Sequence, residues 1–335
     1  MIGKRIRLIR QANQLSLQQL AQLLTEAGFP ITKGALSNYE TGKVAPSFAM
    51  LETLGTKLGV APTFFSREGW DDFSTTLYGI GDLVPAHIQE IQAYVQIELE
   101  RVVSVDEVIG ALPQKRDVVP IPIGGSEDDA IENAVLSIRD TFGLGRYAIA
   151  SVSQFLEEEG WLLFLLPGEF IVKRFSGIEH SHDLRFIFCE PSPYLDEYRS
   201  LLLREFGRSV LEFPVGTEDQ VLSRFSRALL FPRPCVISMF GEKRTRIQNE
   251  ELLLAKHKYG LSRRQVMDRL RECQIISAEY YNDFVQYLDQ HRFLCREASS
   301  SSHLLFHEEA TRYSTHVAHA KAEGLLSGDY DAYFW

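Results

Sequence analysis

The sequence predicts a mainly α-helical protein with a smaller α+β part. Apolar residues recur at helical spacing through most of the 335 residues, and Ser, Thr, Gly and Pro mark where helices begin and end. Three apolar runs between residues 161 and 189 have the length and composition of strands. Helical segments flank these runs on both sides, which favours a small sheet packed against helices.

The composition is that of a globular protein, with 45% hydrophobic and 24% charged residues. No apolar run is long enough to span a bilayer, and the basic N-terminus lacks the apolar core of a signal peptide. We therefore expect a cytoplasmic protein of two or three domains with no membrane partner. No glycine-rich phosphate loop and no Cys/His dyad is visible in the sequence, so no metal and no other cofactor is expected. The cysteines are far apart and are expected to be free thiols; they are Cys189, Cys235, Cys273 and Cys295.

Charge is distributed unevenly along the chain. Residues 1–66 hold seven Lys or Arg against three Glu, a net charge of +4, whereas the whole chain carries −10. We call residues 1–66 the head and the rest of the chain the body. Because the head is basic and the body is acidic, the head is the part expected to bind a polyanion.

The first 66 residues contain five helix signals. Ile2, Ile6 and Ile9 share one face of the first helix. Ser16 and Gln19 have the spacing of a capping box, so the second helix begins at Leu17. The other three helices begin after residues that favour a helix N-terminus, namely Thr32, Ser47 and Pro62, and the fourth ends at Gly59.

This segment, residues 1–66, resembles the lambda-repressor/Cro-like (XRE-type) helix-turn-helix domain. The resemblance covers about 60 residues, and the turn at 26–31 is longer than is usual in that family. The stretches that carry it are Ser16–Ala21, Leu36–Lys43, Pro46 and Leu51–Leu58.

The resemblance implies that the third helix enters the major groove of double-stranded DNA. The residues implied to face base edges are Thr32, Lys33, Gly34, Ser37 and Asn38. Those implied to contact the DNA backbone are Ser16, Gln18 and Lys43. Two alternatives stay open: Asn38 is a local helix cap, or the whole domain is a protein-interaction module.

Residues 67–115 are predicted to be a helical linker or dimerisation segment, because Ile91, Val95 and Leu99 lie in an apolar stripe. The stripe suits either a core or a dimer seam. The breaker-rich segment 116–125 marks the start of the next domain.

Residues 116–295 are predicted to form the α+β domain, and 296–335 a spacer and helical tail. A helix capped by Ser126 precedes the three strands at 161–166, 169–177 and 184–191. Helices follow at 195–214 and 220–236, and then three more separated by turns at 260–262 and 275–277. The last three resemble a second helix-turn-helix, although packing on the body is the favoured interpretation. Ser299–Ser302 is expected to be a flexible spacer.

The 130–290 region resembles an ImmA/IrrE-type metallopeptidase domain, whose zinc helix carries H-E-x-x-H. In this chain that helix reads R-E-F-G-R, with Arg204, Glu205 and Arg208 at the motif positions. The other matching stretches are Phe142–Gly145, Phe155–Gly160, Leu184–Cys189 and Phe225–Pro232. A guanidinium has no lone pair to give and repels a cation, so the resemblance implies a peptidase that has lost its zinc and its activity.

The place of the family's third, acidic ligand falls at Gln220 or Val221, with Glu218 and Asp219 close by. Glu205 is expected either to pair with Arg208 at i, i+3 or to be a helix-surface charge. His180 and His182 form an HxH pair that is either part of a polar loop or a relocated metal site.

Together these observations predict a transcriptional regulator, more specifically a repressor, that binds an operator as a homodimer. Its body is expected to be an inactive peptidase-like domain whose cleft takes a protein, peptide or small-molecule effector. Two alternatives remain. One is an antitoxin-like regulator that binds a partner protein and represses a shared operon. The other is an active metallopeptidase with a relocated metal site that uses Glu205, Glu218 or Asp219 and the histidines at 180 and 182.

Overall fold

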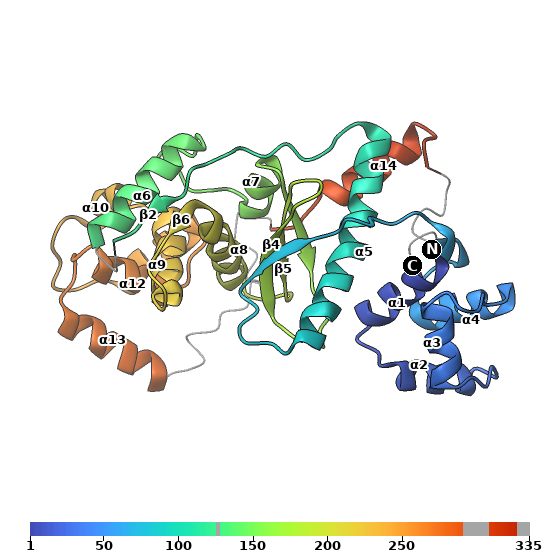
Figure 1. Cartoon of the computed structure of the whole chain (residues 1–335). Coiled ribbons are helices and arrows are strands. Elements are labelled where there is room, and N and C mark those ends of the chain that lie inside the picture. The colour runs from blue at the N-terminus through green and yellow to red at the C-terminus, as the bar shows by residue number, and fades with distance from the viewer. Residues whose placement is uncertain (125–127, 291–307, 327–335) are drawn as a thin grey trace.

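The computed structural model describes residues 1–124, 128–290 and 308–326. The chain is mainly helical with a small mixed sheet near its centre, as predicted (Figure 1). None of the helices in these ranges is long and apolar enough to cross a membrane. Ser126, Cys295, the Ser299–Ser302 spacer and residues 327–335 of the predicted tail lie outside the described residues.

The N-terminal domain has the five predicted helical segments, and their starts are set by local caps. The Ser16 hydroxyl accepts a hydrogen bond from the Gln19 amide at 3.2 Å, and the Gln19 side chain accepts one from the Ser16 amide. The fifth segment is a 3₁₀ turn. The elements are α1 (Ile2–Ala12), α2 (Leu17–Glu26), α3 (Lys33–Glu40), α4 (Phe48–Leu58) and η1 (Pro62–Ser66).

The segment after this domain contains a strand that was not expected from the sequence. β1 (Thr75–Tyr78) pairs antiparallel with β4 (Arg174–Glu179) at the edge of the central sheet. The helix α5 (Pro85–Ile109) follows and forms the helical part of the predicted linker. The body's sheet therefore takes its edge strand from the predicted linker. Strand β1 has only four residues, all of them partly or fully exposed, so the sequence lacks the alternation of apolar and polar residues by which a strand is recognised.

The central sheet has the strand order β1-β4-β5-β3. β3 (Trp161–Leu165) and β5 (Leu184–Cys189) are parallel, while β4 is antiparallel to β5 and to β1. All three predicted strands are present, but β4 begins only at Arg174. A separate two-stranded parallel pair joins β2 (Ile121–Pro122) to β6 (Leu211–Glu212).

The sheet is covered on both faces, and its two parallel strands, β3 and β5, are largely apolar. On one face, Val95, Leu99 and Val102 of α5 pack against Phe164, Phe186 and other sheet residues. On the other face lie α7 (Val152–Glu158) and α8 (Leu195–Val210), and Figure 1 shows the sheet between α5 and α8. The apolar stripe of α5 is therefore core within one chain and not a free dimer seam.

The remaining helices form a layer beyond α8. Arg269 is fully buried here and donates to Glu132 at 2.7 Å and to the carbonyl oxygen of Phe231. The predicted helix-turn-helix-like unit therefore packs on the body. The helices are α6 (Asp128–Thr141), α9 (Glu218–Leu230), α10 (Arg233–Phe240), α11 (Asn249–Tyr259), α12 (Arg263–Glu272) and α13 (Ala278–Gln290).

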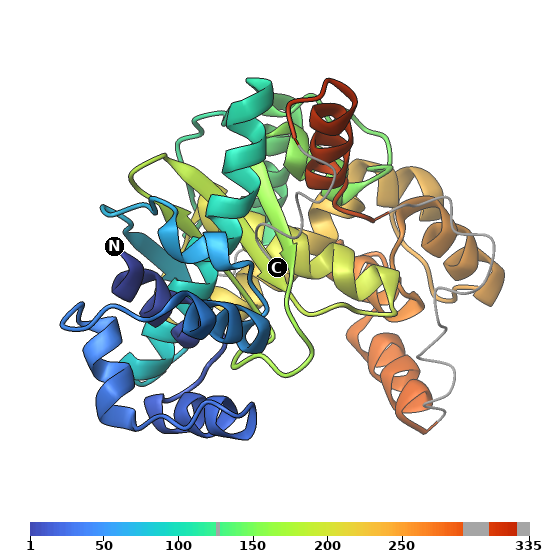
Figure 2. The ribbon, with the colours of Figure 1, turned by 90° about the vertical axis from the view of Figure 1, so that its right-hand side faces the viewer.

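The last described helix, α14 (Arg312–Ala322), returns to the other end of the molecule and packs along α5 (Figure 2). Asp106 of α5 is fully buried and accepts hydrogen bonds from Arg312 at 3.0 Å and from His316 at 2.6 Å. A buried carboxylate that is matched by two donors fixes where α14 lies on α5.

Candidate DNA-binding interface and the charged cluster of α8

The candidate recognition helix α3 is held at its C-terminal end by α1. A Cβ placed on Gly3 would lie 2.4 Å from the carbonyl oxygen of Tyr39, so only glycine permits this approach of the two helices. Arg10 of α1 donates two hydrogen bonds to the Glu40 carboxylate, at 2.6 and 3.1 Å. These contacts leave the N-terminal half of α3 facing outward.

Four of the five predicted base-reading residues are exposed: Thr32, Lys33 and Gly34 at the start of α3, and Asn38 towards its C-terminal end. No described residue pairs with the side chains of Lys33 and Asn38. Asn38 lies inside the helix, and it is its backbone carbonyl, not its amide side chain, that accepts hydrogen bonds from Lys43 and Val44. The alternative that Asn38 is a cap is therefore wrong.

The hydroxyls of Thr32 and Ser16 are both helix caps. Thr32 accepts from the Ala35 amide at 3.2 Å, as Ser16 does from Gln19. A hydroxyl that accepts in this way still has its own proton to donate, so a phosphate contact is compatible with capping. Ser37 is half-buried, whereas Gln18 and Lys43 are exposed.

Some of the cations of this domain have a carboxylate partner, and others have none in the described part of the chain. Arg10 pairs with Glu40, and Lys4 pairs with Asp71 at 2.7 Å. The exposed cations that no described residue pairs with are Arg7, Lys33, Lys43 and Lys57. The count of seven Lys and Arg in residues 1–66 therefore overstates the number of cations that are available to a phosphate backbone.

Arg5 joins this domain to the body. Its guanidinium lies 2.6 Å from Glu100 of α5 and 3.9 Å from the ring centre of Phe64, and its Nε donates to the carbonyl oxygen of Phe64. Glu100 also accepts from the Trp70 amide at 3.1 Å and from Gln96 at 2.9 Å. Both side chains of the ion pair are at most 9% exposed, so this is a buried, hydrogen-bonded junction.

A family model described as Helix-turn-helix matches residues 6–65. The N-terminal domain is an XRE-type helix-turn-helix domain. This match supports DNA-binding transcriptional regulation as the function of the chain, and it covers the five segments from α1 to η1. No curated protein and no solved structure matches the chain.

The helix α8 carries the R-E-F-G-R motif, and its glutamate is in the interior. Glu205 has no exposed surface and accepts from the Ser176 hydroxyl at 2.8 Å and from Arg208 at 2.9 Å. Arg174 of β4 lies 3.5 Å from the other carboxylate oxygen. The predicted Glu205–Arg208 pair is confirmed, and the alternative of a surface charge is wrong.

The two arginines of the motif also reach α9. Arg204 pairs with Asp219, and Arg208 pairs with Glu218, both in the first turn of that helix. Burial lowers the pKa of Arg204, and repulsion from Arg174 adds to this effect. Three guanidinium groups and three carboxylates thus lie together at this point, and each carboxylate is paired with at least one arginine. We call Arg174, Arg204, Glu205, Arg208, Glu218 and Asp219 the arginine cluster.

The glycine of the motif has a packing role. A Cβ on Gly207 would lie 2.8 Å from Phe225 and 2.9 Å from Leu222, so α8 and α9 meet closely at this residue. No three metal-binding side chains converge anywhere in residues 1–124, 128–290 and 308–326. A guanidinium–carboxylate network of this kind fixes the positions of its side chains.

The two predicted histidines of the β4–β5 turn have other partners. His180 Nε2 lies 2.8 Å from the Thr76 hydroxyl, which ties the turn to β1. His182 stacks on Trp70 with ring centres 3.9 Å apart, and its Nδ1 lies 3.1 Å from Glu179. Both therefore lie where they fasten the 67–80 segment to the sheet.

Several residues of these sites were missed from the sequence. Arg174 and Ser176 carry no motif, and their contact with Glu205 depends on strand β4 lying over helix α8. Arg5 was counted among the cations available to DNA. Its helical position on the same face as Ile2, Ile6 and Ile9 was the one available sign that it points inward.

Proposed function

We propose that the protein is a transcriptional repressor that binds a double-stranded operator through α3, as a homodimer with one α3 in each half-site. The observation that carries this proposal is the exposed face of α3, which presents Lys33, Gly34 and Asn38 on a domain matched as helix-turn-helix. An Asn amide suits adenine, and Lys33 suits guanine or phosphate.

The proposal is tested by selecting bound duplexes from random DNA and measuring affinity by fluorescence anisotropy. Asn38→Ala should weaken binding to the selected duplex about tenfold or more and relax the preference at one position. Lys33→Ala should also weaken binding, with a shallower salt dependence if it contacts phosphate. Lys321→Ala, on the exposed face of α14, is the matched control and should bind as the parent does. Unchanged affinity in both α3 variants would refute the assignment of the recognition helix.

We further propose that the body is an ImmA/IrrE-like domain that has lost zinc and peptidase activity. Support comes from the position of R-E-F-G-R on a helix under the sheet and from the cationic surroundings of Glu205. Glu218 and Asp219 of α9 pair with the two arginines. Histidines at positions 204 and 208 would therefore lie beside an acidic side chain, which is the arrangement that a His-His-acid zinc site needs.

Elemental analysis of purified protein tests this second proposal. The parent should contain less than about a tenth of an equivalent of zinc, and Arg204→His/Arg208→His should gain close to one equivalent. Arg263→His/Arg264→His on α12 controls for adventitious binding by added histidines. About one equivalent of zinc in the parent would overturn the proposal and favour a metallopeptidase.

The dimer is tested by light scattering after size exclusion, with and without the selected duplex. Because the apolar stripe of α5 is buried within one chain, the dimer contact lies on another surface. A monomer under both conditions would refute the dimer while leaving the DNA-binding proposal standing.

A further inference from the structure

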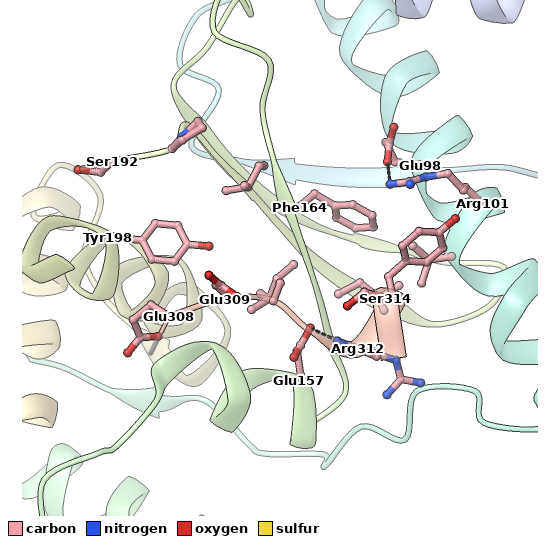
Figure 3. Close-up of a pocket in the computed structure, with 17 residues that line it drawn as sticks. Glu98, Arg101, Glu157, Phe164, Ser192, Tyr198, Glu308, Glu309, Arg312 and Ser314 are labelled. Carbon is pink, nitrogen blue, oxygen red and sulfur yellow. Dashed lines mark hydrogen bonds and ion pairs between the residues drawn. The ribbon is translucent and has the colours of Figure 1, made fainter. Parts of the chain in front are cut away.

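A cavity of about 620 Å³ lies away from the arginine cluster, between β3, α5 and the segment that leads into α14 (Figure 3). This volume is typical of sites for small ligands and short peptide segments. Its walls come from Leu162–Leu165 of β3, from Glu98, Arg101 and Val102 of α5, and from Glu308–Ala310 and Arg312–Ser314. Tyr198 of α8 and Glu157 of α7 close the other side.

The cavity runs along the edge of β3. Successive side chains of a strand point to opposite faces, so a cavity over one face touches alternate residues. Four consecutive residues, 162–165, line this cavity, as expected where it follows the strand's edge. In the order β1-β4-β5-β3, β3 is an outer strand, and β5 is the one described strand that pairs with it. Unpaired amide and carbonyl groups of such an edge are a template for a further strand.

The lining is acidic overall, with four carboxylates against two guanidinium groups. Three of the carboxylates are engaged: Glu98 with Arg101, Glu157 with the amides of Thr311 and Arg312, and Glu308 with Arg199. Glu309 is exposed and has no partner among the described residues, and Figure 3 shows it beside Tyr198. A cationic group in the cavity would therefore find an acceptor on the α7–α8 side.

We propose that this cavity binds an extended peptide segment of another protein, which adds as a strand to the free edge of β3. Alternate side chains of the peptide would face the apolar wall formed by Val102, Leu162 and Phe164. The side chains between them would face Glu157 and Glu309, so the preferred sequence alternates apolar and basic residues.

Helix α5 links this cavity to the DNA-binding domain, and this step rests on the proposed function. Glu98 and Arg101 form part of the cavity wall, while Glu100, between them on the same helix, holds Arg5 of α1. A strand inserted against α5 would therefore press on the element that positions α1. Since α1 in turn holds α3, peptide binding should change DNA affinity.

The test uses the full chain and a fluorescein-labelled, end-blocked Val-Lys-Val-Lys-Val peptide, followed by anisotropy without DNA. Saturable binding is expected, with a loss of about tenfold or more when alternate peptide nitrogens are methylated, because strand addition needs their N–H groups. Replacing both peptide lysines by Glu should also abolish binding. Ala310→Trp, at an exposed wall residue, should fill the cavity and reduce affinity about tenfold or more. Ala322→Trp, equally exposed but outside the cavity, should leave binding unchanged.

No binding of this peptide, or equal binding by Ala310→Trp, would overturn the site. If the methylated and unmethylated peptides bind with equal affinity, strand addition is refuted, and the cavity would instead be a pocket for cationic amphiphiles. The readout without DNA separates this result from failure of the DNA-binding proposal. Adding peptide to the complex with selected duplex should change DNA affinity at least threefold in the parent but not in Ala310→Trp. An unchanged affinity would refute the link through α5.

Discussion

The junction between Arg5 and Glu100 should contribute far more to stability than its exposed neighbour on the same helix. Glu100→Gln keeps the shape of the side chain and an acceptor for the Trp70 amide, but it removes the charge that balances Arg5. Both side chains are at most 9% exposed, so the cation would remain buried without a counter-ion. Breaking a buried ion pair generally costs about 3–5 kcal/mol. Because Arg5 would keep its contacts with Phe64, we expect Glu100→Gln to lower the free energy of unfolding by about 3 kcal/mol, at the lower end of this range.

The matched control is the Lys4–Asp71 pair, one residue away on α1. Its separation of 2.7 Å is close to the 2.6 Å of the buried pair, but its side chains are 75% and 79% exposed. Solvent screens such a pair, so Asp71→Asn should leave stability unchanged. The comparison thus varies burial at nearly constant geometry.

Urea unfolding measured by tryptophan fluorescence suits this test, because Trp70 donates its amide to Glu100 and lies at the junction. The midpoint should fall clearly for Glu100→Gln and stay constant for Asp71→Asn. Arg5→Met/Glu100→Leu, which replaces both charges by apolar groups, should recover most of the loss. A Glu100→Gln variant that unfolds at the parent's urea concentration would refute the inference that the buried pair holds the domains together.

Three further outcomes are expected. Gly207→Ala should lower the free energy of unfolding by about 1–3 kcal/mol, because its Cβ would meet Phe225 at 2.8 Å; Gly124→Ala, where a Cβ has open space, is the control for the same urea measurement. Burial raises the pKa of Glu98 above its ordinary 4.5 despite the opposing effect of Arg101. The folded state therefore binds the Glu98 proton more tightly than the unfolded state, and protonation of Glu98 stabilises the fold. This stabilisation is complete below about pH 4.5 and is lost as the pH rises through the pKa of Glu98 in the folded state. Glu98→Gln should remove this component from a urea–pH series between pH 4 and 7, and an unaltered profile would argue against a raised pKa. Arg269→Met should destabilise the helical layer strongly because it leaves the buried Glu132 without its partner, whereas the half-exposed Arg264→Met should have little effect on circular dichroism melting.

Local chemistry accounts for the parts of the fold that could be predicted. Helix starts at Leu17, Lys33 and Phe48 follow from hydroxyl side chains that cap amides three residues ahead. Strands β3 and β5 were recognisable because both of their faces are buried and the runs are almost entirely apolar. The Glu205–Arg208 pair was predictable because the two residues are three positions apart and so lie on the same face of one helix.

The parts that were missed join residues that are distant in the chain. The pairing of β1 with β4 unites residues about 100 positions apart and needs no strong pattern in either partner. The inward position of Arg5 depends on Glu100 being presented by α5, and the carboxylate that pairs with the Arg199 guanidinium is Glu308, 109 residues away. A composition or a short motif cannot report such partners.

The sequence by itself therefore determined the helix-turn-helix domain, the mainly helical class and the arginines in the α8 motif, because these rest on caps, periodicity and residue identity within a few positions. Only the tertiary structure decided which cations are free for DNA, how Glu205 is surrounded and where a cavity opens beside β3. Those properties depend on which segments lie side by side, and burial then decides whether a charge is a surface group or part of the core.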